Sequence, residues 1–107
     1  MHVAAIILAA GQGRRMGLPV AKQFLDLCGK PLIYYSLKAF EDSKADEIIL
    51  VTSKEQLDYC RSLVSEYNLA KVSEVVEGGK ERYDSVYNAL VSIRRADYVL
   101  VHDGARP

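Results

Sequence analysis

Apolar residues along this chain fall into short runs separated by stretches with helical periodicity. The runs lie at Val3 to Leu8, Glu47 to Thr52, Val72 to Val76 and Tyr98 to His102. Each run has the length of a strand, and helical patterns fill the intervals between them. Strands that alternate with helices predict a parallel sheet whose crossover helices cover its faces. The pattern therefore predicts an α/β fold in a single domain.

Local signals place the first two helices. Pro31 is expected at the first position of one helix, because its ring presets the helical φ angle. The buried stripe of this helix is predicted to consist of Ile33, Leu37 and Phe40. Ser53 and Gln56 have the spacing of a capping box, which predicts a second helix that runs to about Tyr67.

The last third of the chain predicts one more helix and one more strand. The helix is expected from about Lys80 to Arg94, with four inward residues, Tyr83, Val86, Leu90 and Ile93. The run from Tyr98 to Val101 is predicted to be a buried parallel strand. Ligands of open α/β sheets bind beyond the carboxyl ends of the strands, so the segment from His102 to Pro107 is expected at the site. Because the sequence stops there, the domain is expected to be truncated.

Charge and cysteine content narrow the function classes. The chain has 14 basic and 14 acidic side chains and therefore a formal net charge of zero. This net charge gives no reason to expect nucleic acid as a partner. No apolar stretch approaches the ~20 residues of a membrane span, and the N-terminus lacks a basic leader. These features predict a soluble cytoplasmic protein without a membrane partner. Cys28 and Cys60 lack a metal-ligand spacing and are expected to be free thiols, in a turn and in the core respectively.

A glycine-containing loop follows the first apolar run. Its first residues are Ala9, Ala10, Gly11, Gln12 and Gly13, and basic side chains follow at Arg14, Arg15 and Lys22. Backbone N–H groups in such a loop can point at an anion. Met16 stands where a dinucleotide fingerprint needs a third small residue, and no Gly-Lys-Ser/Thr tripeptide of a Walker loop occurs. A nucleotidyltransferase loop that wraps a triphosphate remains, beside a simple glycine-rich turn with solvated arginines.

Asp103 is the first acidic residue after the fourth strand. On adjacent strands, this carboxylate and a triphosphate on the first loop would lie close together. Mg²⁺ is usually held by one or two carboxylates together with substrate phosphates, so Asp103 is a candidate metal ligand. His102 and Asp103 are expected to point to opposite faces, which leaves His102 a structural role. A turn or helix-cap aspartate before Gly104 is the alternative.

A third group of candidate residues runs from Glu77 to Ser85. Gly78 and Gly79 allow the backbone to approach a ligand closely. Arg82 and Ser85 are three residues apart at the predicted start of a helix and therefore share a face. A hydroxyl and backbone groups there could recognise the edge of a pyrimidine base. A Gly-Gly turn with a surface arginine is the alternative.

Taken together, these motifs resemble the 2-C-methyl-D-erythritol 4-phosphate cytidylyltransferase family. They span almost the whole chain in order, at Ala9 to Gly17, Lys22 to Phe24, Gly78 to Val86 and Val101 to Pro107. The resemblance implies a Rossmann-like nucleotide-binding domain with a mainly parallel sheet, and a homodimer in the complete protein. Residues 1–107 would form the N-terminal nucleotide-binding part of a single cytidylyltransferase domain.

The resemblance also implies a role for each candidate. Arg15 and Lys22 would stabilise the transition state, and Asp103 would bind Mg²⁺. The nucleotide CTP would be bound by Ala9, Ala10, Gly11, Gln12, Gly13, Gly79, Lys80, Arg82, Ser85 and Gly104. The acceptor would be a polyol phosphate, 2-C-methyl-D-erythritol 4-phosphate. Two alternatives stay open: ribitol 5-phosphate as the acceptor, and a nucleotide-binding fragment without catalysis.

Overall fold

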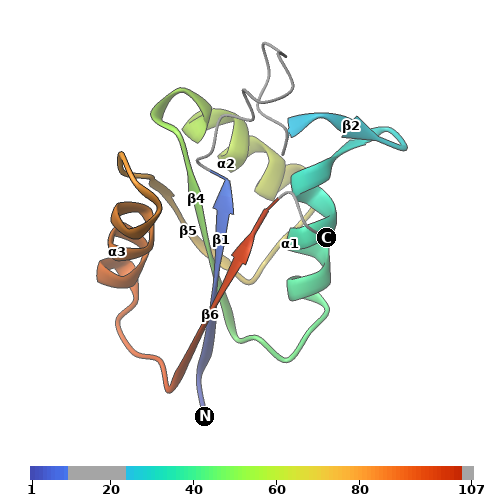
Figure 1. Ribbon diagram of the computed structural model, residues 1–107. Helices are drawn as coiled ribbons and strands as arrows, with labels where there is room; N and C mark the ends of the chain where they lie inside the picture. Colours follow the sequence, from blue (N-terminus) through green and yellow to red (C-terminus); the bar gives the residue numbers. More distant parts are fainter. Residues whose placement is uncertain (10–23, 105–107) are drawn as a thin grey trace.

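A four-stranded parallel sheet in the order β5-β4-β1-β6 forms the centre of the fold (Figure 1). The computed structural model describes residues 1–9 and 24–104. The strands of the sheet are β1 (Val3–Ala9), β4 (Glu47–Thr52), β5 (Val72–Glu77) and β6 (Tyr98–Asp103). The helices are α1 (Leu32–Glu41), the 3₁₀ helix η3 (Lys54–Gln56), α2 (Leu57–Glu66) and α3 (Arg82–Ser92). The predicted α/β fold is confirmed.

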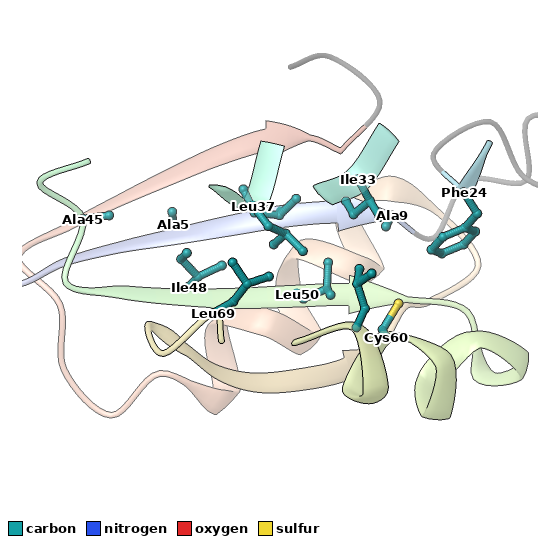
Figure 2. Close-up of a cluster of buried hydrophobic side chains, with 12 residues drawn as sticks. Ala5, Ala9, Phe24, Ile33, Leu37, Ala45, Ile48, Leu50, Cys60 and Leu69 are labelled. Carbon is teal, nitrogen blue, oxygen red and sulfur yellow. The ribbon is translucent and has the colours of Figure 1, made fainter. Parts of the chain in front are cut away.

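Helices cover both faces of the sheet because its two central strands are apolar on both sides. Figure 1 shows α3 on one side of the sheet and α1 and α2 on the other. The larger core lies under α1 and α2, where alternate residues of β1 and β4 such as Ala5 and Leu50 pack in one cluster with Leu37 and Cys60 (Figure 2). Intervening residues such as Ile6 pack toward α3 in a smaller cluster. This alternation follows from the two-residue period of a strand.

A short hairpin precedes the first helix. Strands β2 (Asp26–Leu27) and β3 (Lys30–Pro31) pair antiparallel across Cys28 and Gly29. Both turn residues have positive φ angles, 55° and 83°, which is the backbone of a type I′ turn. The predicted place of Cys28 in a turn is confirmed. Pro31 serves as the N-cap of α1 and not as its first residue.

The predicted cap of the second helix is wrong. Ser53 makes no side-chain capping hydrogen bond, and residues Lys54–Gln56 form a 3₁₀ turn before α2 begins at Leu57. A capping box is present at α3, where Glu81 and Asp84 each accept a hydrogen bond from the other's backbone N–H. The Ser53 prediction failed because spacing alone does not determine whether the first turn is α or 3₁₀.

Two burial predictions are also wrong. On α3, Tyr83 and Leu90 are exposed, while Ala89 and Ser85 are the buried residues. Strand β6 is not buried either, since its residues from Tyr98 to Val101 are all exposed. Its apolar composition resembles that of a central strand, yet β6 lies at an edge of the described sheet. Within residues 1–9 and 24–104, no helix is long and apolar enough to cross a membrane.

Candidate active site

The carboxyl ends of all four parallel strands meet at one edge of the sheet. Ala9 pairs with Thr52, Thr52 pairs with Glu77, and Leu8 pairs with Asp103 in the strand register. The segments that leave these strands therefore start side by side, although they are far apart in sequence. This is the edge at which open α/β sheets bind ligands. The structure thus brings the described candidates Ala9, Gly79, Ser85 and Asp103 to a common edge.

Asp103 faces the amino end of α3. Its Oδ1 lies 3.8 Å from Nε of Arg82, the first residue of that helix. The preceding residue, His102, faces the opposite side and stacks edge-on against Phe40 of α1. The predicted opposition of these neighbours is confirmed, and it follows from the alternation of side chains along a strand. Asp103 and Arg82 therefore lie together on the α3 side of the edge.

Gly79 and Ser85 are joined by a hydrogen bond between the segment after β5 and the start of α3. Ser85 is 4% exposed, and its hydroxyl accepts this bond from the Gly79 N–H at 3.1 Å. A Cβ at Gly79 would lie 2.2 Å from the Cβ of Asp84, so only glycine permits this approach. The Ser85 hydroxyl hydrogen can still be donated to a second group. Lys80, which follows Gly79 in the chain, is exposed.

The backbone of Gly104 is used within the fold. Its N–H donates to the Leu8 carbonyl at 2.8 Å, and its carbonyl accepts from the Ser36 hydroxyl at 3.1 Å. A Cβ at this position would lie 2.4 Å from Cδ1 of Ile33 and 3.0 Å from the Leu8 oxygen. Gly104 thus holds the end of β6 against β1 and α1. Contact between its backbone and a nucleotide remains a prediction.

Several predicted site residues lie outside the described ranges 1–9 and 24–104. These are the predicted transition-state residues Arg15 and Lys22, and the loop residues Ala10, Gly11, Gln12 and Gly13. Ala9, at the end of β1, is the described residue at which that loop begins. The roles assigned to all these residues stay predictions.

The described residues fit a magnesium site that depends on substrate phosphates. Among residues 1–9 and 24–104, no three His, Cys, Asp or Glu side chains cluster to form a protein-only metal site. The Asp103 side chain is 41% exposed at the strand edge, so one carboxylate is accessible to a cation. Mg²⁺ is commonly bound through one or two carboxylates and substrate phosphates, with waters at the remaining positions. Asp103 is the described residue that would hold it.

Two polar residues at this edge were not predicted from the sequence. The Asn88 side-chain amide donates to the Glu77 carbonyl at 3.0 Å and fixes α3 to the end of β5. Thr52 is fully buried, and its hydroxyl donates to the Ala9 carbonyl at 3.4 Å. A polar residue at the end of an apolar strand is the signal that could have identified Thr52. Nothing in the helical pattern of α3 distinguishes Asn88 from a solvated residue.

Cys60 of α2 lies beneath Thr52 in the core. Burial raises the pKa of its thiol, and a hydrogen bond with Thr52 opposes that rise only in part. A thiol whose pKa is raised is a poor nucleophile at neutral pH. The predicted structural role of Cys60 agrees with this burial, and the exposed Cys28 agrees with its predicted place in a turn.

Comparison with known proteins adds independent information. The family model described as "IspD: 2-C-methyl-D-erythritol 4-phosphate cytidylyltransferase" matches residues 3–107. A 2-C-methyl-D-erythritol 4-phosphate cytidylyltransferase from Clostridium perfringens is 56% identical over 105 residues, which are 97% of this chain and 47% of that relative. The chain therefore spans about half the length of this curated relative.

Solved structures agree with the sequence comparison. The 4-diphosphocytidyl-2C-methyl-D-erythritol synthase from Anaerococcus prevotii has a TM-score of 0.80 and 31% identity, and the match covers 99% of this chain and 44% of that one. The bifunctional IspDF from Campylobacter jejuni has a TM-score of 0.81 and 30% identity, with coverage of 99% and 27%. The Rossmann-like nucleotidyltransferase fold expected for this chain is thereby confirmed.

Proposed function

Because the chain belongs to the 2-C-methyl-D-erythritol 4-phosphate cytidylyltransferase family, we propose that residues 1–107 supply the N-terminal nucleotide-binding part of such an enzyme. The reaction would transfer CMP from CTP to 2-C-methyl-D-erythritol 4-phosphate and release pyrophosphate, a step in isoprenoid precursor synthesis. The observation that carries the proposal is the pairing of Arg82 with Asp103 at 3.8 Å. Arg82 belongs to the same segment as Gly79 and Ser85, which are joined by a hydrogen bond. A candidate metal ligand and a candidate base-recognition segment thus share one edge.

The chemistry requires positioning and charge neutralisation. The phosphate monoester of the acceptor is anionic at neutral pH, so its oxygen can attack the α-phosphorus of CTP without a general base. A bond forms from that oxygen to the α-phosphorus, and the bond to the bridging oxygen of pyrophosphate breaks. In this proposal Arg15 and Lys22 neutralise the charge that develops on the phosphates. The loop from Ala9 to Gly13 holds the triphosphate through backbone N–H groups.

The segment from Gly78 to Ser85 is proposed to recognise cytosine. Hydrogen bonding to Gly79 holds the Ser85 hydroxyl in place, and the capping box of Glu81 and Asp84 fixes the first turn of α3. Polar groups that are held in place before binding discriminate well between bases, because the wrong base leaves these groups of the protein without hydrogen-bonding partners. Arg82 and the backbone of Lys80 support this segment in the proposal.

Further parts of the proposal concern the metal and the assembly. Mg²⁺, when bound through Asp103 and the phosphates, supplies positive charge for the transferred group. A homodimer and a cytoplasmic location also belong to the proposal. Both are supported by the membership of this chain in a family of biosynthetic enzymes.

Calorimetry followed by a turnover assay tests the proposed function. CTP should bind this chain in the presence of Mg²⁺ and bind less tightly after EDTA, with UTP as the matched base control. Pyrophosphate release is then measured with 2-C-methyl-D-erythritol 4-phosphate and, separately, with ribitol 5-phosphate. Binding without release agrees with the proposal, because residues 1–107 are proposed as only the nucleotide-binding part, and release with one acceptor identifies that acceptor. Absence of CTP binding would contradict the proposal.

A further inference from the structure

Thr52 joins two segments of the candidate site. It is the last residue of β4, between β1 and β5 in the sheet, and it is fully buried. A buried hydroxyl needs a hydrogen-bonding partner, because burial without one is unfavourable. The position of Thr52 at the carboxyl end of a central strand therefore makes its partners informative.

The hydrogen-bonding partners of Thr52 lie at the end of β1 and just after β5. Its hydroxyl donates to the Ala9 carbonyl at 3.4 Å, where β1 ends. Its own carbonyl accepts from the Gly78 N–H at 2.7 Å, where the segment after β5 begins.

These hydrogen bonds continue from Thr52 to Gly79 and Ser85. Gly78 precedes Gly79, whose N–H donates to the buried Ser85 hydroxyl. Described contacts thus run from Ala9 through Thr52 and Gly78 to Ser85. The bond to Gly78 uses the backbone of Thr52 and would survive any substitution. The side-chain bond to Ala9 adds to the strand pairing of β1 with β4 and is lost with the hydroxyl.

We propose that Thr52 is a positioning residue that fixes the end of β1 relative to the Gly78 to Ser85 segment. This inference rests on the proposed function, in which those two parts contact the phosphates and the base of one nucleotide. A ligand that touches both parts gains affinity when their spacing is preset, because less ordering remains to be done on binding. A ligand that touches only one part gains nothing from Thr52.

The matched variants are Thr52→Val, which keeps the shape and removes the hydroxyl, and Thr52→Ser, which restores it. Ser92→Ala is the control, because the Ser92 hydroxyl donates to the Ala89 carbonyl at 2.7 Å in the last turn of α3. Affinity is measured by calorimetry for CTP and for inorganic tripolyphosphate, both with Mg²⁺. The loss of one neutral hydrogen bond corresponds to about a two- to tenfold change in affinity.

Thr52→Val should weaken CTP binding by about that factor and leave tripolyphosphate binding within about twofold. Thr52→Ser should recover most of the CTP affinity, and Ser92→Ala should not change it. Equal weakening of both ligands, or no weakening of either, would overturn the inference. If Thr52→Val does not fold, Thr52→Ala, which also lacks the hydroxyl, takes its place in the same comparison with Thr52→Ser, and equal weakening of both ligands there would overturn the inference. An unsubstituted chain that binds neither ligand overturns the proposed function itself.

Discussion

Arg82 Nε lies 3.8 Å from Asp103 Oδ1, so the first residue of α3 meets the last residue of β6 at the edge of the sheet. The two side chains are 63% and 41% exposed. An ion pair this exposed contributes about 0–1 kcal/mol to stability. The pair therefore adds little to stability, and the place of both residues in a ligand site stays a prediction.

Substitution of Asp103 by asparagine should remove most of the magnesium dependence of CTP binding. The change keeps the side-chain shape and deletes the negative charge that attracts the cation. We expect the affinity measured with Mg²⁺ to fall about tenfold or more, toward the value measured with EDTA. Asp97→Asn is the control, because Asp97 lies just before β6 at the opposite end and accepts a hydrogen bond from the His2 N–H. Unchanged stimulation by Mg²⁺ in Asp103→Asn would remove the metal assignment.

Lys22→Ala should lower kcat by at least about 10²-fold in the catalytically complete enzyme, with a modest change in CTP affinity. A charge directed at the transition state stabilises it more than it stabilises the bound substrate. Steady-state kinetics of pyrophosphate release measure both parameters. Arg14→Ala, close in sequence but off the matched motif, should have a much smaller effect. Near-normal kcat in the Lys22 variant contradicts its catalytic role.

Ser85→Ala should narrow the preference for CTP over UTP. The buried hydroxyl accepts a hydrogen bond from the Gly79 N–H and keeps its own hydrogen for the base. Its loss therefore removes a polar group that distinguishes cytosine from uracil. We expect the affinity ratio to fall by about two- to tenfold, as measured by calorimetry with each nucleotide. Ser92→Ala in the same helix should leave the ratio unchanged. Equal weakening of CTP and UTP would assign Ser85 a purely structural role.

The sequence predicted what depends on local periodicity. Apolar runs predicted strands β1, β4 and β5, and helical periodicity predicted the buried residues Ile33 and Leu37 of α1. Side-chain alternation along a strand predicted that His102 and Asp103 face opposite sides of the sheet. The exposure of β6 could not be predicted, because burial depends on which elements cover a strand. The capping of α3 by Glu81 and Asp84 depends on turn geometry that spacing does not determine.

The polar contacts at the site required the fold itself. The Thr52 hydroxyl and the Ala9 carbonyl are 43 residues apart in sequence and meet only through the parallel register of β1 and β4. The approach of Arg82 to Asp103 likewise depends on how α3 lies across the sheet. Motif spacing identified these last two residues as candidates, and the structure added that they are neighbours.

Stability should decrease in acid partly through Glu47 at the amino end of β4. Burial tends to raise the pKa of this carboxyl, but hydrogen bonds from Ser73 at 2.5 Å and His2 at 2.9 Å outweigh it and lower the pKa overall. A pKa lower in the folded than in the unfolded chain stabilises the fold above the unfolded value. That contribution is lost as pH falls through the folded value.

Glu47→Gln should therefore reduce the free energy of unfolding by about 1 kcal/mol at pH 7 and change it less at pH 3. Urea unfolding followed by circular dichroism at both pH values measures the difference. Glu74→Gln, at an exposed position of β5, is the control and should shift neither value appreciably. An equal loss of stability at pH 7 and pH 3 in Glu47→Gln would show that the charge of Glu47 is not responsible.

The 107-residue chain should self-associate through β6. This strand lies at an edge of the described sheet, and its exposed residues are Tyr98, Val99, Leu100 and Val101. An apolar edge strand presents backbone donors and acceptors that a second copy can pair with. Val99→Lys should shift the chain toward monomer in sedimentation velocity, because a buried lysine disfavours strand pairing. Tyr83→Lys, 74% exposed on α3, should have little effect. A purely monomeric unsubstituted chain at about 100 μM would contradict this prediction, since contacts of even millimolar to micromolar strength are detectable there.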